Sequence, residues 1–164
     1  MLAELRQGIR EGTLDPPIVP LLEVFARLNC CYTIQSCWGH FVHDMQPETK
    51  NLASLKEYAG KVQHVLYRIA YLALCIEKSD EGLVLYRDLQ GIASRDPEHI
   101  QFGSSEFFWK MVPNTYVIQV APEWGIEEDS LWMGMEEALS IEEVRGRFFE
   151  ELQALVYSHG KSGG

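Results

Sequence analysis

One stretch, residues 65–77, constrains the fold of this chain more than any other. Its apolar residues are nearly continuous, and the longest purely apolar run, 69–76, is eight residues long. A helix needs about 20 such residues to span a bilayer, whereas a run rich in Val, Ile and Tyr is typical of a buried strand. We therefore expect a core strand within 65–77, which other elements of the fold must cover.

Patterns typical of helices and of strands alternate along the rest of the chain. Asp15, before two prolines, and Ser79 each predict a helix start. Ser140, followed three residues later by a glutamate, predicts the start of the C-terminal helix. Helices are expected at 1–11, 18–28, 79–95, 127–139 and 140–157, and further strands at 31–34, 41–43, 100–109 and 116–120. The order predicts a single α+β domain at 1–157, with a mixed or antiparallel sheet packed against several helices, and a flexible tail at 158–164.

Composition excludes several classes of protein. The chain has 164 residues, of which 46% are hydrophobic and 23% charged, as in ordinary globular proteins and unlike disordered ones. Its formal net charge is -10, and residues 121–152 hold ten acidic residues against two arginines. Because nucleic acids and anionic membranes attract clustered Lys and Arg, this balance argues against both as default partners.

The four cysteines do not have the spacing of a disulfide-rich secreted protein. The N-terminal segment mixes acidic and basic residues among its few apolar ones, so it has neither a signal-peptide core nor a transit-peptide composition. We therefore expect reduced thiols and a cytoplasmic location. The sequence does not indicate an oligomeric state.

The segment 35–40, Gln-Ser-Cys-Trp-Gly-His, predicts a ligand-binding turn. Ser36 can donate and accept hydrogen bonds, Gly39 can adopt a positive φ, and successive amides of a turn can bind an anion. Cys37 and His40 add a thiol and an imidazole. The alternative is a structural turn in which Cys37 and Trp38 are simply packed.

Cys37, His40 and His43 are three residues apart and are ligand types that bind zinc. On a strand His40 and His43 would point to opposite faces, whereas on a helix they would share one. No CxxC or HExxH pattern supplies further ligands, so a metal is not the expected cofactor. A second alternative makes Cys37 a nucleophile with His40 as its base.

A second candidate segment, 101–109, combines a small, polar centre with a dense aromatic flank. The three aromatic residues at 107–109 are expected to pack in the core. Gly103, Ser104 and Glu106 are the residues assigned to ligand binding, with Glu106 orienting a cationic or amino group.

Residues 17–43 resemble the opening of the tRNA wybutosine-synthesising methyltransferase family. A helix ending in Leu28-Asn29 leads to a Ser-Cys-x-Gly sequence, where the family has Ser-Cys-Ser-Gly-Arg. Here Trp38 replaces the second serine and His40 replaces the arginine. That family transfers a methyl group from S-adenosylmethionine to a modified guanosine of tRNA. The resemblance implies that Ser36, Cys37 and Gly39 line a cofactor or substrate pocket.

We therefore predict a small-molecule-binding protein, in the first instance a methyltransferase-like protein of tRNA modification with S-adenosylmethionine as cofactor. One alternative is a non-catalytic module that binds a metal or an anion at the same turn. The other is a protein-interaction subunit whose tryptophans form an assembly surface. Those tryptophans are Trp38, Trp109, Trp124 and Trp132.

Overall fold

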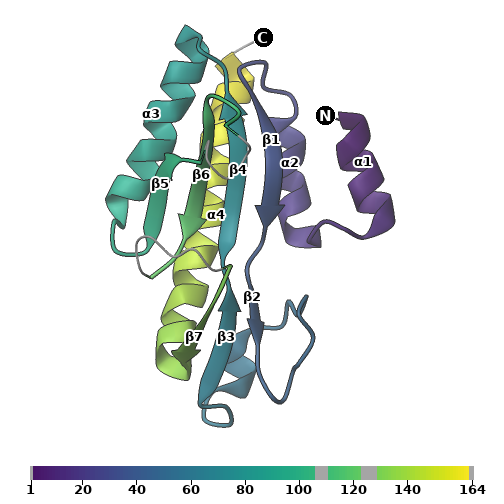
Figure 1. The fold of residues 1–164 in the computed structure, drawn as a ribbon, viewed down its shortest axis with the longest axis vertical. Helices are drawn as coiled ribbons and strands as arrows, with labels where there is room; N and C mark the ends of the chain where they lie inside the picture. Colours follow the sequence, from purple (N-terminus) through teal and green to yellow (C-terminus); the bar gives the residue numbers. More distant parts are fainter. Residues whose placement is uncertain (1, 106–110, 123–128, 163–164) are drawn as a thin grey trace.

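Two antiparallel sheets joined end to end form the frame of the fold (Figure 1). The computed structural model describes residues 2–105, 111–122 and 129–162. The four-stranded sheet has the order β1-β4-β6-β5, and the three-stranded sheet has the order β2-β3-β7. Every strand pair is antiparallel, which confirms the predicted α+β class with an antiparallel sheet. The strands are β1 Cys31–Cys37, β2 His40–Val42, β3 His64–Arg68, β4 Ala70–Ile76, β5 Ile100–Ser104, β6 Thr115–Val120 and β7 Ser130–Gly134.

The chain passes from one sheet to the other at two adjacent places. Ile69 alone separates β3 from β4, and its N–H is hydrogen-bonded to the Asp129 carbonyl at 2.9 Å. Trp38 and Gly39 separate β1 from β2. The single strand predicted within 65–77 is therefore two strands, because its continuous apolar pattern carries no sign of the change of sheet.

The turn predicted at 35–40 does not reverse the chain within one sheet. Ser36 and Cys37 belong to β1, and the chain continues after Gly39 into β2 of the other sheet. Strand-like residues on either side of a glycine predict a hairpin as readily as a continuation, and only the pairing partners distinguish the two. Here β1 pairs with β4 while β2 pairs with β3.

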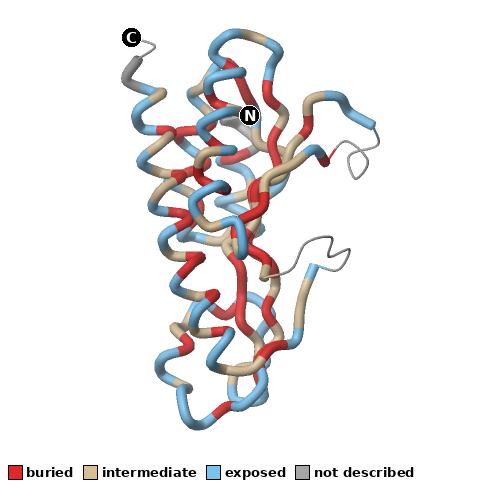
Figure 2. Tube along the Cα trace, turned by 90° about the vertical axis from the view of Figure 1, so that its left-hand side faces the viewer, coloured by how far each residue is buried: buried red, intermediate tan, exposed pale blue. Residues whose placement is uncertain are grey.

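Helices α2 (Val19–Phe25), α3 (Asp80–Arg95) and α4 (Met135–Ser162) pack on one face of the four-stranded sheet, where α4 contacts both other helices (Figure 1). Alternate residues of β4, including Leu72 and Leu74, are fully buried on that face. Figure 2 shows buried and exposed positions alternating along α4. With 28 residues, α4 is about 42 Å long and contacts β6 of one sheet and β3 and β7 of the other. Among the helices within the described residues, none is long and apolar enough to cross a membrane.

The other helical elements are α1 (Leu2–Glu11), which packs against α2, and the 3-10 helices η1 (Pro16–Ile18) and η2 (Leu55–Tyr58). Ser79 caps α3 as predicted, since its hydroxyl accepts a hydrogen bond from the Gly82 amide at 3.1 Å. Asp15 precedes η1 but makes no side-chain cap hydrogen bond. Its carboxylate instead bonds with the Trp38 amide and the His40 ring.

The C-terminal region differs from the prediction in two ways. Residues 130–134 form β7, not a helix, because they pair with β3 along its length. Helix α4 then begins at Met135 and runs through the predicted start at Ser140, which is an exposed position inside the helix. The predicted flexible tail is helical as far as Ser162, and His159 joins α4 to α3 through a 2.8 Å hydrogen bond with Asp88.

Candidate functional site

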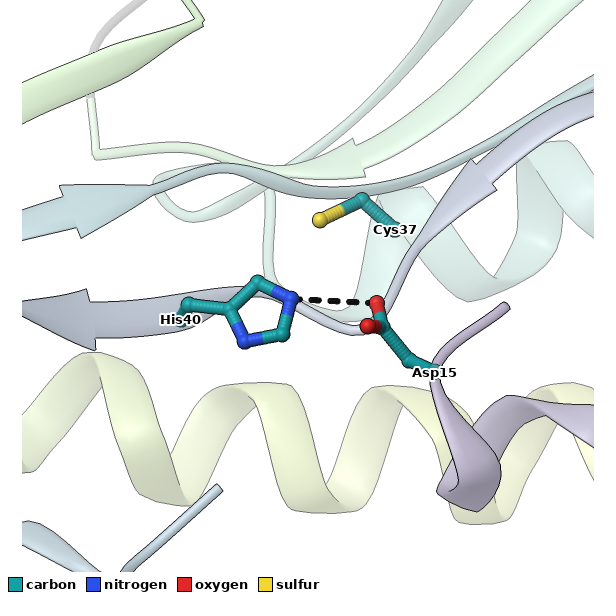
Figure 3. A group of neighbouring side chains, drawn as sticks. All are labelled: Asp15, Cys37 and His40. Carbon is teal, nitrogen blue, oxygen red and sulfur yellow. Dashed lines mark hydrogen bonds and ion pairs between the residues drawn. The ribbon is translucent and has the colours of Figure 1, made fainter. Parts of the chain in front are cut away.

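Three side chains from three segments meet at the junction of the sheets (Figure 3). Asp15 comes from the loop between α1 and η1, Cys37 ends β1, and His40 begins β2. One ligand atom from each lies within 4.8 Å of the other two. We call these residues the Asp15–Cys37–His40 cluster.

The hydrogen bonds of His40 define its protonation state. Its Nδ1 lies 3.1 Å from the backbone carbonyl oxygen of Asn51, and its Nε2 lies 3.1 Å from Oδ2 of Asp15. A carbonyl oxygen and a carboxylate can only accept, so both ring nitrogens donate. His40, which is 2% exposed, is therefore a buried imidazolium paired with the Asp15 carboxylate.

The pKa values of the pair agree with this assignment. Burial alone would lower the pKa of His40, but hydrogen bonds with Asp15, Cys37 and Asn51 outweigh it and raise the pKa from 6.5 to about 10. Burial would likewise raise the pKa of Asp15, and hydrogen bonds from His40 and the Trp38 amide lower it overall. Each group therefore stabilises the charged form of the other.

The raised pKa of His40 predicts a stability that depends on pH. Because the folded pKa lies above the unfolded value of 6.5, the contribution of His40 is fully present below pH 6.5 and is lost as the pH rises toward 10. The free energy of unfolding should fall by up to about 1.4 kcal/mol per pH unit in this range. Urea unfolding of wild type and His40→Gln at pH 6, 8 and 9.5 measures it.

The His40→Gln variant should show the flatter pH dependence. His64→Gln, which changes an exposed histidine of β3, should keep the wild-type slope. Equal slopes in all three proteins would mean that the Asp15–His40 pair does not contribute.

The backbone of Trp38 and Gly39 holds the cluster together. The Trp38 amide donates to Oδ2 of Asp15 at 2.9 Å, and the Gly39 amide donates to Sγ of Cys37 at 3.4 Å. Gly39 has a φ of +86°, and a Cβ at this position would lie 2.8 Å from the Cβ of Ala70. The predicted positive φ of Gly39 is thus confirmed, and close packing gives a second reason for glycine.

Arg145 supports this backbone from α4. It is 9% exposed, and its Nη1 donates to the carbonyl oxygen of Gly39 at 2.8 Å. Its guanidinium lies 5.4 Å from the ring centre of Trp38 and 5.1 Å from that of Phe41, which are cation–π distances. Glu142, one turn earlier, lies 3.7 Å from Nη2.

A row of polar side chains crosses the four-stranded sheet next to the cluster. The strand register aligns Cys37 with Tyr71, Tyr71 with Gln119, and Gln119 with Gln101. These four residues, the polar row, lie on the face opposite the helices, because the buried Leu72 of β4 points to the helical side. Gln119 donates to Gln101 at 3.1 Å, and Gln101 donates to the Ala121 carbonyl at 3.3 Å.

A cleft of about 320 Å³ lies between α1, α2 and β1, on the opposite side of the end of β1 from the polar row. Its lining includes Gln35 and Ser36 of β1, Thr13 of the loop that carries Asp15, and the apolar Leu5 and Leu22. A larger cleft of about 740 Å³ lies at the opposite end of β1, near Cys30 and His159. No predicted site residue within the described segments lines that larger cleft, so we assign the site to the smaller one.

The structure separates the two segments predicted to bind ligand. Gly103 and Ser104 lie on β5, at the opposite edge of the sheet from β1. Three strand-to-strand steps of about 4.8 Å place them roughly 14 Å from β1. Glu106 lies outside the described residues. Ser36, Cys37, Gly39 and His40 do lie together, although His40 and Gly39 are buried and so position the site from beneath.

The predicted metal ligands are only partly brought together. Cys37 and His40 share the cluster, but His43 is absent from it and packs on Tyr58 with ring centres 4.4 Å apart. The strand spacing of His40 and His43 explains their separation. Asp15 takes the place predicted for His43.

Of the four tryptophans predicted to form an assembly surface, the structure describes Trp38 and Trp132. Trp38 stacks on Phe149 with ring centres 4.2 Å apart, whereas Trp132 is 70% exposed on β7. Trp109 and Trp124 lie outside the described residues. Trp38 therefore contributes to packing beneath the junction.

Asp15, Asn51, Tyr71 and Arg145 belong to the candidate site but were not predicted from the sequence. For Asp15 a signal existed, but the Asp-Pro-Pro sequence is explained equally well by a helix start. Arg145 is one of only two arginines in the acidic segment 121–152, and nothing in the sequence distinguishes it from Arg147. Nothing local marks Asn51 or Tyr71.

The fold and site define a single-domain α+β protein with two antiparallel sheets and a polar cluster at their junction. No model of a known protein family matches the chain, and no curated protein matches it. Two solved structures of the PH1069 protein from Pyrococcus horikoshii, one of them from strain OT3, are similar to it. The first has a TM-score of 0.55 at 15% identity and covers 97% of this chain and 91% of that one. The second has a TM-score of 0.56 at 16% identity and covers 98% and 90%. This likeness extends over nearly the whole chain and concerns the fold.

Proposed function

We propose that this protein binds S-adenosylmethionine and transfers its methyl group to a nitrogen of a base in tRNA, in the cytoplasm. The observation that carries the proposal is the position of Ser36. It belongs to the Ser-Cys-x-Gly sequence that resembles the methyltransferase family, and it lines a ligand-sized cleft beside the Asp15–Cys37–His40 cluster.

The cleft suits a cofactor with both polar and apolar parts. Its volume of about 320 Å³ is at the lower end of the range of about 300–1,000 Å³ for small-molecule sites. Leu5 and Leu22 offer an apolar wall for adenine, and Thr13 and Ser36 offer hydroxyls for ribose and for the amino-acid part. β1 is an edge strand of its sheet, so the backbone N–H and C=O groups on its open side can also form hydrogen bonds with the cofactor.

The polar row suits the methyl acceptor. Tyr71 provides a half-buried ring on which a planar base can stack, and Gln119 next to it provides an amide. The acidic residues of α4 belong to the helical layer on the other face of the sheet. A polyanion on the polar row therefore avoids that group of carboxylates.

In the proposed reaction the base nitrogen attacks the methyl carbon while the bond from that carbon to the sulfonium sulfur breaks. S-adenosylhomocysteine leaves, and the proton of the attacking nitrogen passes to solvent. The reacting nitrogen and methyl carbon must come within about 3–3.5 Å of each other, so donor and acceptor have to meet at the exposed end of β1, where Ser36 of the cleft adjoins Cys37 of the polar row. The buried Asp15–His40 pair and Arg145 keep that strand end in place.

Calorimetric titration with S-adenosylmethionine tests the cofactor. Wild type should bind saturably at one site per chain, and Ser36→Ala should weaken binding by about 5- to 10-fold, as expected for the loss of one hydrogen bond. Ser94→Ala is the matched control, because Ser94 is exposed on α3, away from the cleft.

Ser94→Ala should bind as wild type does. Absence of saturable binding to wild type at millimolar cofactor would refute the proposal. Equal weakening in both serine variants would place the cofactor elsewhere.

A further inference from the structure

The Asp15–Cys37–His40 cluster has the donor atoms of a transition-metal site. A thiolate, an imidazole and a carboxylate are the three ligand types that proteins use for zinc. Three protein ligands leave a fourth position for water or substrate, as in catalytic zinc sites. Neither the proposed methyl transfer nor the cofactor cleft uses these atoms as ligands.

The distances require little movement. Nε2 of His40 and Oδ2 of Asp15 are 3.1 Å apart, and all three ligand atoms lie within 4.8 Å of one another. A tetrahedral ion with bonds of about 2.0–2.3 Å would hold such atoms about 3.3–3.8 Å apart. Small side-chain rotations are enough to reach this spacing.

The surroundings of His40 are those of a metal ligand. In metal sites the second ring nitrogen of a histidine usually donates to a carbonyl or a carboxylate, which fixes the orientation of the ring. Nδ1 of His40 does so to the Asn51 carbonyl at 3.1 Å and thereby aims Nε2 at the cluster. The Trp38 amide donates to Oδ2 of Asp15 and so restrains the position of its carboxylate.

The charge of the ligand set also suits a divalent ion. A carboxylate, a thiolate and a neutral imidazole together carry two negative charges, which balance the two positive charges of a divalent ion. The bound ion would therefore leave no uncompensated charge in this partly buried site.

From these donors, distances and charges we propose that Asp15, Cys37 and His40 form a binding site for a divalent transition metal of the zinc type. Cys37 is half-buried at the end of the polar row, which gives the fourth coordination position access to a substrate placed there. The site goes beyond the proposed cofactor binding and does not depend on it.

Titration with Co²⁺ at pH 8 under reducing conditions tests the site, because thiolate-bound Co²⁺ has a charge-transfer band in the near ultraviolet. Wild type should bind one Co²⁺ per chain with this band, and Zn²⁺ should displace it. Cys37→Ala should lose the band. Cys75→Ala should keep it, since Cys75 is a half-exposed thiol on the neighbouring strand, outside the cluster.

Asp15→Asn and His40→Gln should each weaken Co²⁺ binding at least 10-fold, as removal of one ligand from a three-ligand site does, whereas His43→Gln should not. Circular dichroism checks that each variant is folded. If Asp15→Asn or His40→Gln does not fold, the comparison of Cys37→Ala with Cys75→Ala still tests the metal site. No charge-transfer band in wild type at millimolar Co²⁺, or a band that persists in Cys37→Ala, would overturn the proposal. None of these measurements uses S-adenosylmethionine, so the two proposals can fail separately.

Discussion

Replacing Gly39 by alanine should lower the free energy of unfolding by about 2–5 kcal/mol. Two effects add at this position. The φ of +86° is costly for any residue with a Cβ, and the new Cβ would lie 2.8 Å from the Cβ of Ala70 and 3.2 Å from its backbone. Ala70 cannot move easily, since it is fully buried and begins β4, an inner strand of its sheet. Urea unfolding followed by circular dichroism measures the loss.

Gly60→Ala is the matched control for Gly39. Gly60 has a φ of +77°, but a Cβ there would meet no atom within 4 Å. Only the backbone effect remains, so the loss should be about 1–2 kcal/mol. Equal losses at the two glycines would show that the contact with Ala70 relaxes and that backbone conformation alone requires glycine at the junction.

Replacing Arg145 by methionine should lower the free energy of unfolding by about 3–5 kcal/mol, the range for removing one partner of a buried ion pair. Methionine has a similar length and is apolar, so the change removes charge and donors while it retains much of the packing. It removes the 2.8 Å donor of the Gly39 carbonyl and the guanidinium 3.7 Å from Glu142. Both groups lie in the partly or fully buried junction.

Two other arginine variants separate charge from geometry. Arg147→Met removes an exposed arginine of α4 whose ion pair with Asp96 spans 3.3 Å, so its effect should be within about 1 kcal/mol. Arg145→Lys keeps the charge but not the planar fork of donors, and should fall between the other two. If Arg145→Met is as stable as Arg147→Met, the buried arginine does not hold the junction.

Much of the fold could be predicted from local patterns. The cap at Ser79, the helix after it and the strands around 100–104 and 115–120 were all predicted, because periodicity and capping are properties of neighbouring residues. The predictions failed where a pattern had two physical explanations. Residues 130–134 carry no periodicity that excludes a helix, and only pairing with β3 makes them a strand.

The candidate site shows the same division. The segment from Ser36 to His40 stands out in the sequence because it gathers a hydroxyl, a thiol, an imidazole and a glycine. Asp15 does not stand out, because an aspartate before prolines is what a helix start requires. Its carboxylate makes no cap and instead reaches His40, 25 residues away.

By itself the sequence determined the class of fold, most of its helices and strands, and the segment that contains Cys37 and His40 of the candidate site, because these depend on residues close together in the chain. Only the tertiary structure decided that the run 65–77 divides between two sheets, that Asp15 replaces His43 beside His40, and that Arg145 lies beneath Gly39, 106 residues before it. Such contacts depend on how the faces of distant elements pack, and a local pattern shows which face is buried but not what lies against it.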